Sequence, residues 1–130
     1  MLKDIDFPEM KNVSIAIIPK GDDYWEVCVI NDGQKKLENV LISSKGYGKL
    51  DGKEVTTSAI RQNLGSIDSK EWKTIESLNS ELSKLNNEFW LSFYIDDKLY
   101  DKKFVFTSES ISEQHVTHIP AIDCKGILHS

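Results

Sequence analysis

The chain has 130 residues, 39% of them hydrophobic and 28% charged, which is typical of one ordinary globular domain. Its formal net charge is −5, and a single arginine, Arg61, stands among 16 basic residues. This charge pattern argues against a nucleic-acid surface, because phosphate binding depends on Lys and Arg. Apolar runs such as Val27–Ile30 are far shorter than the roughly 20 residues that a membrane helix needs.

The segment Met1–Pro8 carries acidic residues where a signal peptide would carry a basic stretch and an apolar run, so we expect a cytoplasmic protein. Cys28 and Cys124 are the two cysteines. We expect both to be free thiols, because stable disulfides form mainly in oxidising compartments. Cys28 lies within a strand pattern and is expected to fill space in the fold.

The first strand is predicted over Val13–Pro19 and the second over Tyr24–Asn31. In the second strand, Trp25, Val27 and Val29 share one face by the two-residue period of a β-strand. We therefore expect these three side chains to point into the core.

A third strand is predicted over Leu37–Ser44, and a fourth over Gly48–Thr57 that folds back at Asp51-Gly52, a dipeptide favoured in type I′ turns. The intervening sequence Ser-Ser-Lys-Gly-Tyr-Gly (43–48) lacks the order of a phosphate-binding loop and is interpreted as a bulged turn. Tyr47 within it is either an exposed binding anchor or an aromatic packed over the bend.

After an ambiguous stretch at residues 58–66, residues 67–75 are interpreted as a turn that leads into a strand. Residues 77–87 are predicted to form the one helix of the chain. Leu78, Leu82 and Leu85 are spaced to give an apolar stripe on such a helix. A helix of about three turns must be held by packing on the sheet.

The clearest hairpin is predicted over residues 88–106, with alternating apolar residues and a loop at Asp97-Lys98. Phe93, Leu91 and Phe89 then lie opposite Lys102, Phe104 and Phe106, respectively. Trp90 and Tyr94 lie on the other face of the same strand.

In the remaining segment, residues 108–130, a last strand is predicted at His115–Ile119. Its isoleucines favour burial, so we expect it to pack on the domain or on a second copy of the chain. About seven strands and one short helix predict a mainly β fold, a single immunoglobulin-like antiparallel β-sandwich over residues 1–130, with a core at 12–106 and a C-terminal extension at 107–130.

Two short passages carry a resemblance. Val29–Gly33 followed by Leu37–Ile42, together with Leu64–Ile67, resembles the strand and turn pattern of bacterial adhesion-type and NEW3-like immunoglobulin-like sandwiches. Cys28 has no partner cysteine on the strand around Phe89, so the inter-sheet disulfide of antibody domains is not expected.

Over nearly its whole length the chain also resembles a family of short uncharacterised bacterial proteins, some of which are labelled phenylalanyl-tRNA synthetase subunits. The similarity lies in Ile17–Pro19, Trp25, Val29–Asn31, Ser43–Gly48 and Trp90–Ile95. A synthetase catalytic domain needs an ATP site with dedicated arginines, and Arg61 alone cannot supply one. The resemblance therefore implies a compact cytosolic sandwich and transfers no catalytic residue.

His115, His118, Asp123, Cys124 and His129 form the one sequence cluster of metal-ligand types. Residues three apart in a strand point to opposite faces, and a zinc signature is absent, so we expect no metal and no cofactor.

The acidic tip of the hairpin, Asp96, Asp97 and Asp101, is attributed to turn formation and not to a calcium loop. With no local nucleophile or acid–base motif, we expect the chain not to be an enzyme.

The leading hypothesis is a non-catalytic module that binds a protein partner or a second copy of itself, with Trp90, Tyr94 and Tyr47 as candidate surface residues. The strand around Trp90 is apolar on both faces, and a simple sandwich requires only one. We expect the second face to be covered within the chain, by the C-terminal segment or the Leu78 helix, or else by another protein. The alternative is a small-ligand protein, metal-binding protein or enzyme with a site near His115, His118 and Tyr47.

Overall fold

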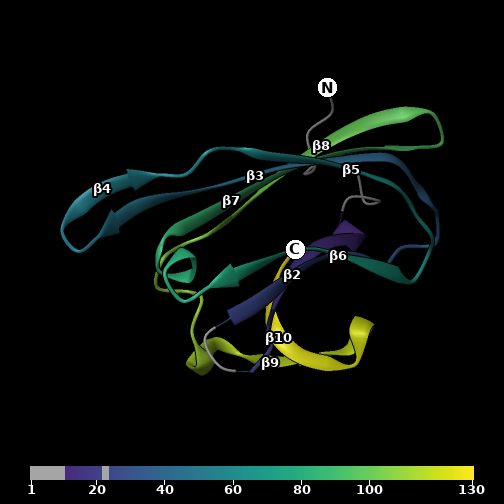
Figure 1. Ribbon diagram of the computed structural model, residues 1–130. Coiled ribbons are helices and arrows are strands. Elements are labelled where there is room, and N and C mark those ends of the chain that lie inside the picture. Colours follow the sequence, from purple (N-terminus) through teal and green to yellow (C-terminus); the bar gives the residue numbers. More distant parts are fainter. Residues whose placement is uncertain (1–10, 22–23) are drawn as a thin grey trace.

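The computed structural model describes residues 11–21 and 24–130, and these form two antiparallel sheets that pack face to face (Figure 1). The first sheet has the order β6-β2-β1-β10-β9, and the second has the order β4-β3-β7-β8, with β5 also paired to β3. The first sheet consists of β1 (Val13–Pro19), β2 (Tyr24–Asn31), β6 (Glu71–Asn79), β9 (Thr117–Ile119) and β10 (Cys124–His129). The second consists of β3 (Leu37–Leu50), β4 (Lys53–Thr56), β5 (Ile60–Ile67), β7 (Asn86–Ile95) and β8 (Lys98–Phe106).

The mainly β architecture is confirmed, but the described part of the chain has ten strands where about seven were predicted. The bounds of β1 and β2 agree with the prediction. Trp25, Val27 and Val29 are buried in the core between the sheets, as the alternation in β2 predicts. The two-residue period holds here because β1 and β2 pair with each other without a register shift.

Strand β3 is longer than predicted and runs without a break through residues 43–48, so the expected bulged turn there is wrong. One edge of β3 pairs with β7, and the other pairs first with β5 and then with β4. The β3–β4 turn does form at Asp51-Gly52, whose φ angles of 52° and 80° satisfy a type I′ turn. This hairpin projects from the body as an arm (Figure 1).

The predicted helix at residues 77–87 is wrong. Strand β6 continues to Asn79, a single 3-10 turn η3 follows at Leu82–Lys84, and β7 begins at Asn86. Two asparagines stabilise this tight connection: Asn79 Oδ1 accepts from the Leu82 main-chain N–H at 2.8 Å, and Asn87 Nδ2 donates to the main-chain oxygen of Leu82 at 2.9 Å. Such side-chain bonds to the backbone compete with helix formation.

The β7–β8 hairpin is confirmed, but its loop is Asp96-Asp97, one residue earlier than predicted. Both aspartates have positive φ, 49° and 64°, as a two-residue type I′ loop requires. The register therefore shifts by two residues, which keeps every side chain on its predicted face. The observed pairs are Phe93–Tyr100, Leu91–Lys102 and Phe89–Phe104, in place of Phe93–Lys102, Leu91–Phe104 and Phe89–Phe106.

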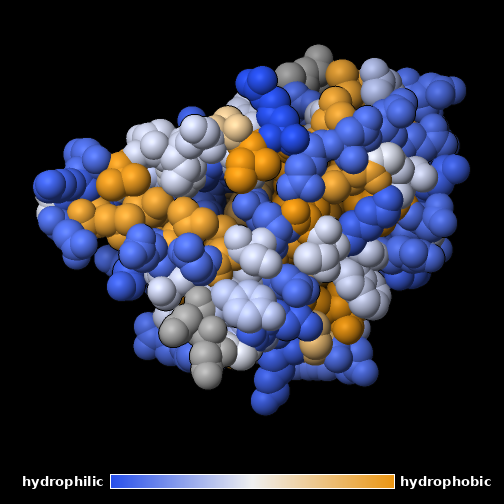
Figure 2. Space-filling view, viewed as in Figure 1, coloured by the Kyte–Doolittle hydropathy of each residue, from blue (hydrophilic) through white to orange (hydrophobic). Residues whose placement is uncertain are grey.

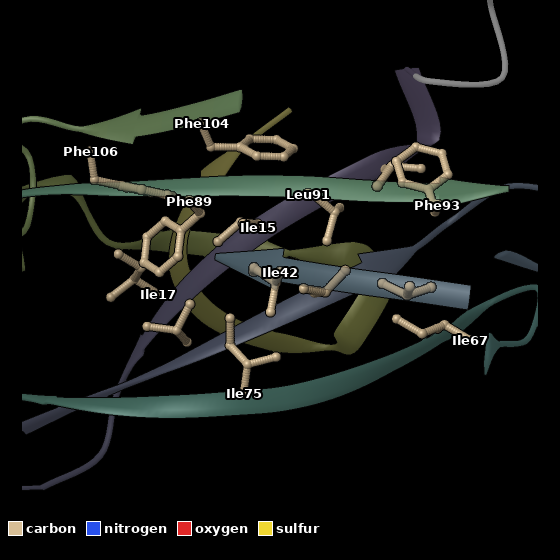
Figure 3. Close-up of a cluster of buried hydrophobic side chains, with 14 of the residues drawn as sticks. Ile15, Ile17, Ile42, Ile67, Ile75, Phe89, Leu91, Phe93, Phe104 and Phe106 are labelled. Atoms are coloured by element: carbon tan, nitrogen blue, oxygen red, sulfur yellow. The ribbon is translucent and has the colours of Figure 1, made fainter. Parts of the chain in front are cut away.

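The main core lies between the two sheets and is built from side chains that alternate along their strands (Figure 3). Phe89, Leu91 and Phe93 of β7 are at most 1% exposed, and they pack towards the isoleucines of the opposite sheet. The edge strands β5 and β6 are linked by Gln62 Nε2, which donates to the main-chain oxygen of Ile75 at 2.8 Å. This bond uses a backbone acceptor on an edge strand that has no further strand beside it among the described residues.

The C-terminal segment packs on the domain, which is one of the two predicted arrangements, but its structure differs in detail. The expected strand at 115–119 is shortened to β9, and a further strand, β10, pairs with both β1 and β9. Between β9 and β10, the 3-10 turn η5 (Pro120–Ile122) lies over the outer face of the first sheet. The resulting second cluster contains Ala16, Cys28, Ile30, Ile119 and Ile122.

Candidate interaction surface

Trp90 lies on the outer face of the second sheet, in the middle of β7. It pairs with Ser43 of β3 on one side and with Lys103 of β8 on the other. The indole is 43% exposed. The expectation that the C-terminal segment or a Leu78 helix covers it is therefore wrong: the C-terminal segment covers the first sheet, and the helix does not form.

A shallow hollow of about 390 Å³ lies beside Trp90 on this face. Leu41, which is 48% exposed, supplies a second apolar side chain to it. Arg61 of β5 is the one charged residue among the described residues that line it. We call this region the Trp90 hollow; its lining residues are Leu41, Ile42, Ser43, Arg61, Gln62, Asn63, Trp90 and Ser92.

Charged side chains on β3, β7 and β8 flank the Trp90 hollow. The Lys103 Nζ lies 5.7 Å from the centre of the Trp90 ring, within the range of a cation–π contact. Glu88 forms ion pairs with Lys103 at 3.4 Å and with Lys45 at 3.7 Å. One carboxylate thus serves two ammonium groups, and with Arg61 the immediate surroundings of Trp90 are basic on a chain of net charge −5.

Tyr94 and Tyr47 share the outer face with Trp90, but they do not converge on it. Tyr94 is four residues along β7, and Tyr47 is four residues along β3 from Ser43, the partner of Trp90. At about 3.3 Å per residue, Tyr94 lies about 13 Å along the strand from Trp90, and Tyr47 lies about 13 Å along the strand from Ser43. Both tyrosines are half-buried. The predicted surface residues are therefore spread along one face.

Leu41 and Arg61 complete the Trp90 hollow, and sequence alternation did not identify them. Irregular pairing between Leu37 and Leu41, with Asn39 at φ 49°, changes the phase of β3. Leu37 and Val40 are both buried although they are three residues apart, and Leu41 consequently points outwards. A simple two-residue period cannot reveal this change.

Apolar side chains also extend along the β3–β4 arm, where Leu50 and Val55 are partly exposed and Ile60 at its base is 51% exposed (Figure 2). The arm and the Trp90 hollow belong to the same sheet. The second sheet therefore presents more exposed apolar surface than a sandwich needs for its own packing.

The histidines of the alternative site lie in another part of the fold. His115 ends the 3-10 turn η4 (Glu113–His115), and His118 is on β9, whereas Tyr47 is on β3 of the other sheet. His118 Nε2 lies 3.6 Å from the Asp123 carboxylate, and both side chains are exposed. Within residues 11–21 and 24–130, no three His, Cys, Asp or Glu side chains gather as metal ligands would.

At the acidic hairpin tip, Asp96 and Asp97 form the two-residue β7–β8 loop, and Asp96 also forms an ion pair with Lys35.

Cys28 and Cys124 are free thiols, in agreement with the sequence analysis. The Cys28 thiol is buried and donates to the main-chain oxygen of Ala16 at 3.8 Å. Burial, with a smaller effect of Cys124, raises the pKa of Cys28 to about 12, so this thiol is a poor nucleophile at neutral pH.

Comparison of the sequence with models of protein families and with curated proteins gave no match. In the part of the chain that the structure describes, no helix has the length and apolar character needed to cross a bilayer.

Proposed function

We propose that this chain is a non-catalytic cytoplasmic module that binds a protein segment on the outer face of its second sheet. The observation that carries the proposal is the exposure of Trp90 (43%) and Leu41 (48%) in one hollow. Large apolar side chains that are exposed together on a folded domain commonly mark a binding surface. The proposal includes membership of the family of short bacterial proteins and of the immunoglobulin-like class of sandwiches, both of which the sequence resembles.

The residues of the Trp90 hollow suit protein recognition. Tryptophan and arginine are enriched among the residues that dominate binding energy at interfaces, and Trp90 and Arg61 line the same hollow. The surface is also pre-organised, because β3 and β7 are each paired on both edges. A rigid sheet loses little conformational entropy when a partner binds.

The chemistry of the hollow favours a segment that carries an acidic side chain next to a large apolar one. Arg61 can form a bidentate pair with a carboxylate, and the exposed faces of Trp90 and Leu41 can pack on the apolar group. The net charge of −5 and the single arginine make nucleic acid a poor partner by comparison. A second copy of the chain is the other protein partner to be tested.

Selection from a displayed library of random peptides tests this proposal. We expect the selected peptides to combine an acidic and a large apolar residue, and Trp90→Ala to weaken their binding at least tenfold, about 1.4 kcal/mol. Trp72→Ala is the matched control, because Trp72 is 46% exposed but lies on the first sheet. Equal peptide binding by the wild-type chain, Trp90→Ala and Trp72→Ala would contradict the proposal. So would a selection that yields no peptide, if sedimentation also shows no dimer of the wild-type chain.

A further inference from the structure

A second, narrower cavity opens at the base of the β3–β4 arm, away from the Trp90 hollow. Its volume is about 70 Å³, several times the minimum of about 10–15 Å³ that one water molecule requires. Exposed Ser58 and Ile60 lie at its mouth. The main-chain N–H of Thr57 donates to the oxygen of Gly46 at 2.8 Å, which holds the mouth against β3.

The walls of this cavity combine apolar side chains with a small set of polar groups. Leu78 and Leu82 form apolar wall, while Ser44 and Asn87 are buried polar residues, 5% and 4% exposed. Glu76 adds a half-buried carboxyl group. A few convergent polar groups in an otherwise apolar recess are the usual composition of a small-ligand site.

Glu76 faces inwards because it pairs directly with Val27, a residue of the core. A bulge follows at Val27/Cys28, so that Ile75 has no direct partner on β2. The carboxyl group of Glu76 forms a hydrogen bond with the Ser44 side chain. Glu76 forms no ion pair within the described part of the chain.

Burial raises the pKa of Glu76, and the hydrogen bond from Ser44 acts in the opposite direction. The charged form of this carboxyl group therefore lacks the stabilisation that a cation would provide. Lys45 also borders the cavity, but its ammonium group pairs with Glu88 on the outer face of the sheet. The cavity thus presents an acidic group with no basic neighbour directed to it.

We propose that this cavity binds a primary ammonium group carried on a short alkyl chain. The ammonium would donate to the Glu76 carboxylate and to the Ser44 hydroxyl oxygen, and the alkyl chain would contact Leu78, Leu82 and Ile60. A free alkylamine and the lysine side chain of a protein share this chemistry. The site is separate from the Trp90 hollow and does not depend on the function proposed there.

NMR titration of the full chain with n-butylammonium, in phosphate buffer free of other amines, tests the proposal. We expect shifts at Ser44, Gly46 and Leu78, and a lower pKa of the Glu76 carboxyl group in the presence of the amine. Glu76→Gln should weaken binding at least tenfold, because the amide retains a hydrogen-bond acceptor but loses the charge. Ser44→Ala should weaken binding by a smaller factor.

Glu26→Gln is the matched control, because it removes a half-buried carboxylate of β2 that does not line the cavity. It should leave butylammonium binding unchanged. Butan-1-ol and butyrate should not bind; equal binding of butan-1-ol, or unchanged binding by Glu76→Gln, would overturn the proposal. Binding of Nα-acetyl-lysine amide alongside butylammonium would indicate a protein lysine as the source, and binding of butylammonium alone would indicate a free amine.

Discussion

Lys103 and Trp90 form a cation–π pair on the outer face of the second sheet, with the ammonium nitrogen 5.7 Å from the ring centre. Glu88 holds Lys103 in this position through an ion pair of 3.4 Å. An exposed cation–π contact contributes about 0.5–1 kcal/mol. The indole is thus fixed on the sheet while 43% of its surface stays open to a partner. Trp90 is therefore available to a binding partner, whereas Trp25 is buried and contributes to the core.

Trp25→Ala should reduce the free energy of unfolding by roughly 3–5 kcal/mol, because it removes a large side chain from the core between the sheets. Chemical denaturation followed by circular dichroism measures this change. Trp72→Ala is the control and should change stability by less than about 0.5 kcal/mol, because Trp72 is 46% exposed. Similar values for the two variants would contradict the register of β2.

The double change Trp90→Ser with Tyr94→Ser should leave a folded protein that loses less than about 2 kcal/mol of stability, because Trp90 is exposed and Tyr94 is only half-buried. Thermal melting and sedimentation should be measured together. If the wild-type chain forms a dimer through this face, the variant should be a folded monomer. Unfolding of the variant would show that these aromatics are needed inside the monomer.

Gly126→Ala should destabilise the fold by about 1–3 kcal/mol, because its new Cβ would lie 2.9 Å from the main-chain oxygen of Ile17. The contact cannot be relieved by a side-chain movement alone. Gly46→Ala is the comparison, since its Cβ would meet side chains alone, Leu85 at 3.2 Å and Thr57 at 3.5 Å. Denaturant midpoints should therefore fall more for Gly126→Ala. The reverse order would be inconsistent with the close approach of β10 to β1.

At pH 8 the folded chain should react with one equivalent of a maleimide, at Cys124, and the denatured chain with two. Ile122→Asp should make Cys28 reactive in the folded state as well, because Ile122 is part of the cluster that covers it. Mass spectrometry of tryptic peptides identifies the labelled thiol. Rapid labelling of Cys28 in the wild-type fold would contradict its burial.

The raised pKa of Cys28 also predicts a change of stability with pH. Below pH 9 the thiol is neutral in both the folded and the unfolded chain, whereas between pH 9 and about 12 only the unfolded chain ionises. The free energy of unfolding should therefore fall as the pH rises through this window. In Cys28→Ala this contribution is absent, so the fall should be less steep. Denaturation at pH 8, 9 and 10 compares the two proteins.

Sequence patterns predicted those parts of the fold in which one local rule decides the structure. Alternation gave β1 and β2 with their bounds, and Asp51-Gly52 marked a turn because both residues accept positive φ. In the β7–β8 hairpin, either of two adjacent dipeptides could form the loop. Alternation does not distinguish these choices, since both keep the apolar face of β7 inwards.

The helix prediction failed because leucines four and three residues apart can be buried in more than one way. Leu78 joins the main core from a strand, Leu82 packs against this core from a 3-10 turn, and Leu85 is buried at the residue that follows this turn. The binding surface was predicted only in part for a similar reason. Trp90 was identified on β7, but Leu41 and Arg61 join it through strand pairing between residues distant in the sequence.

NMR mapping of a peptide selected by the wild-type chain is the most direct test of the proposed binding surface. Titration of the peptide into labelled protein should shift the amide signals of Leu41, Ser43, Arg61 and Ser92 and the indole N–H of Trp90. These residues line one hollow although they come from three strands. Shifts confined to β9, β10 and the outer face of the first sheet would contradict the proposal.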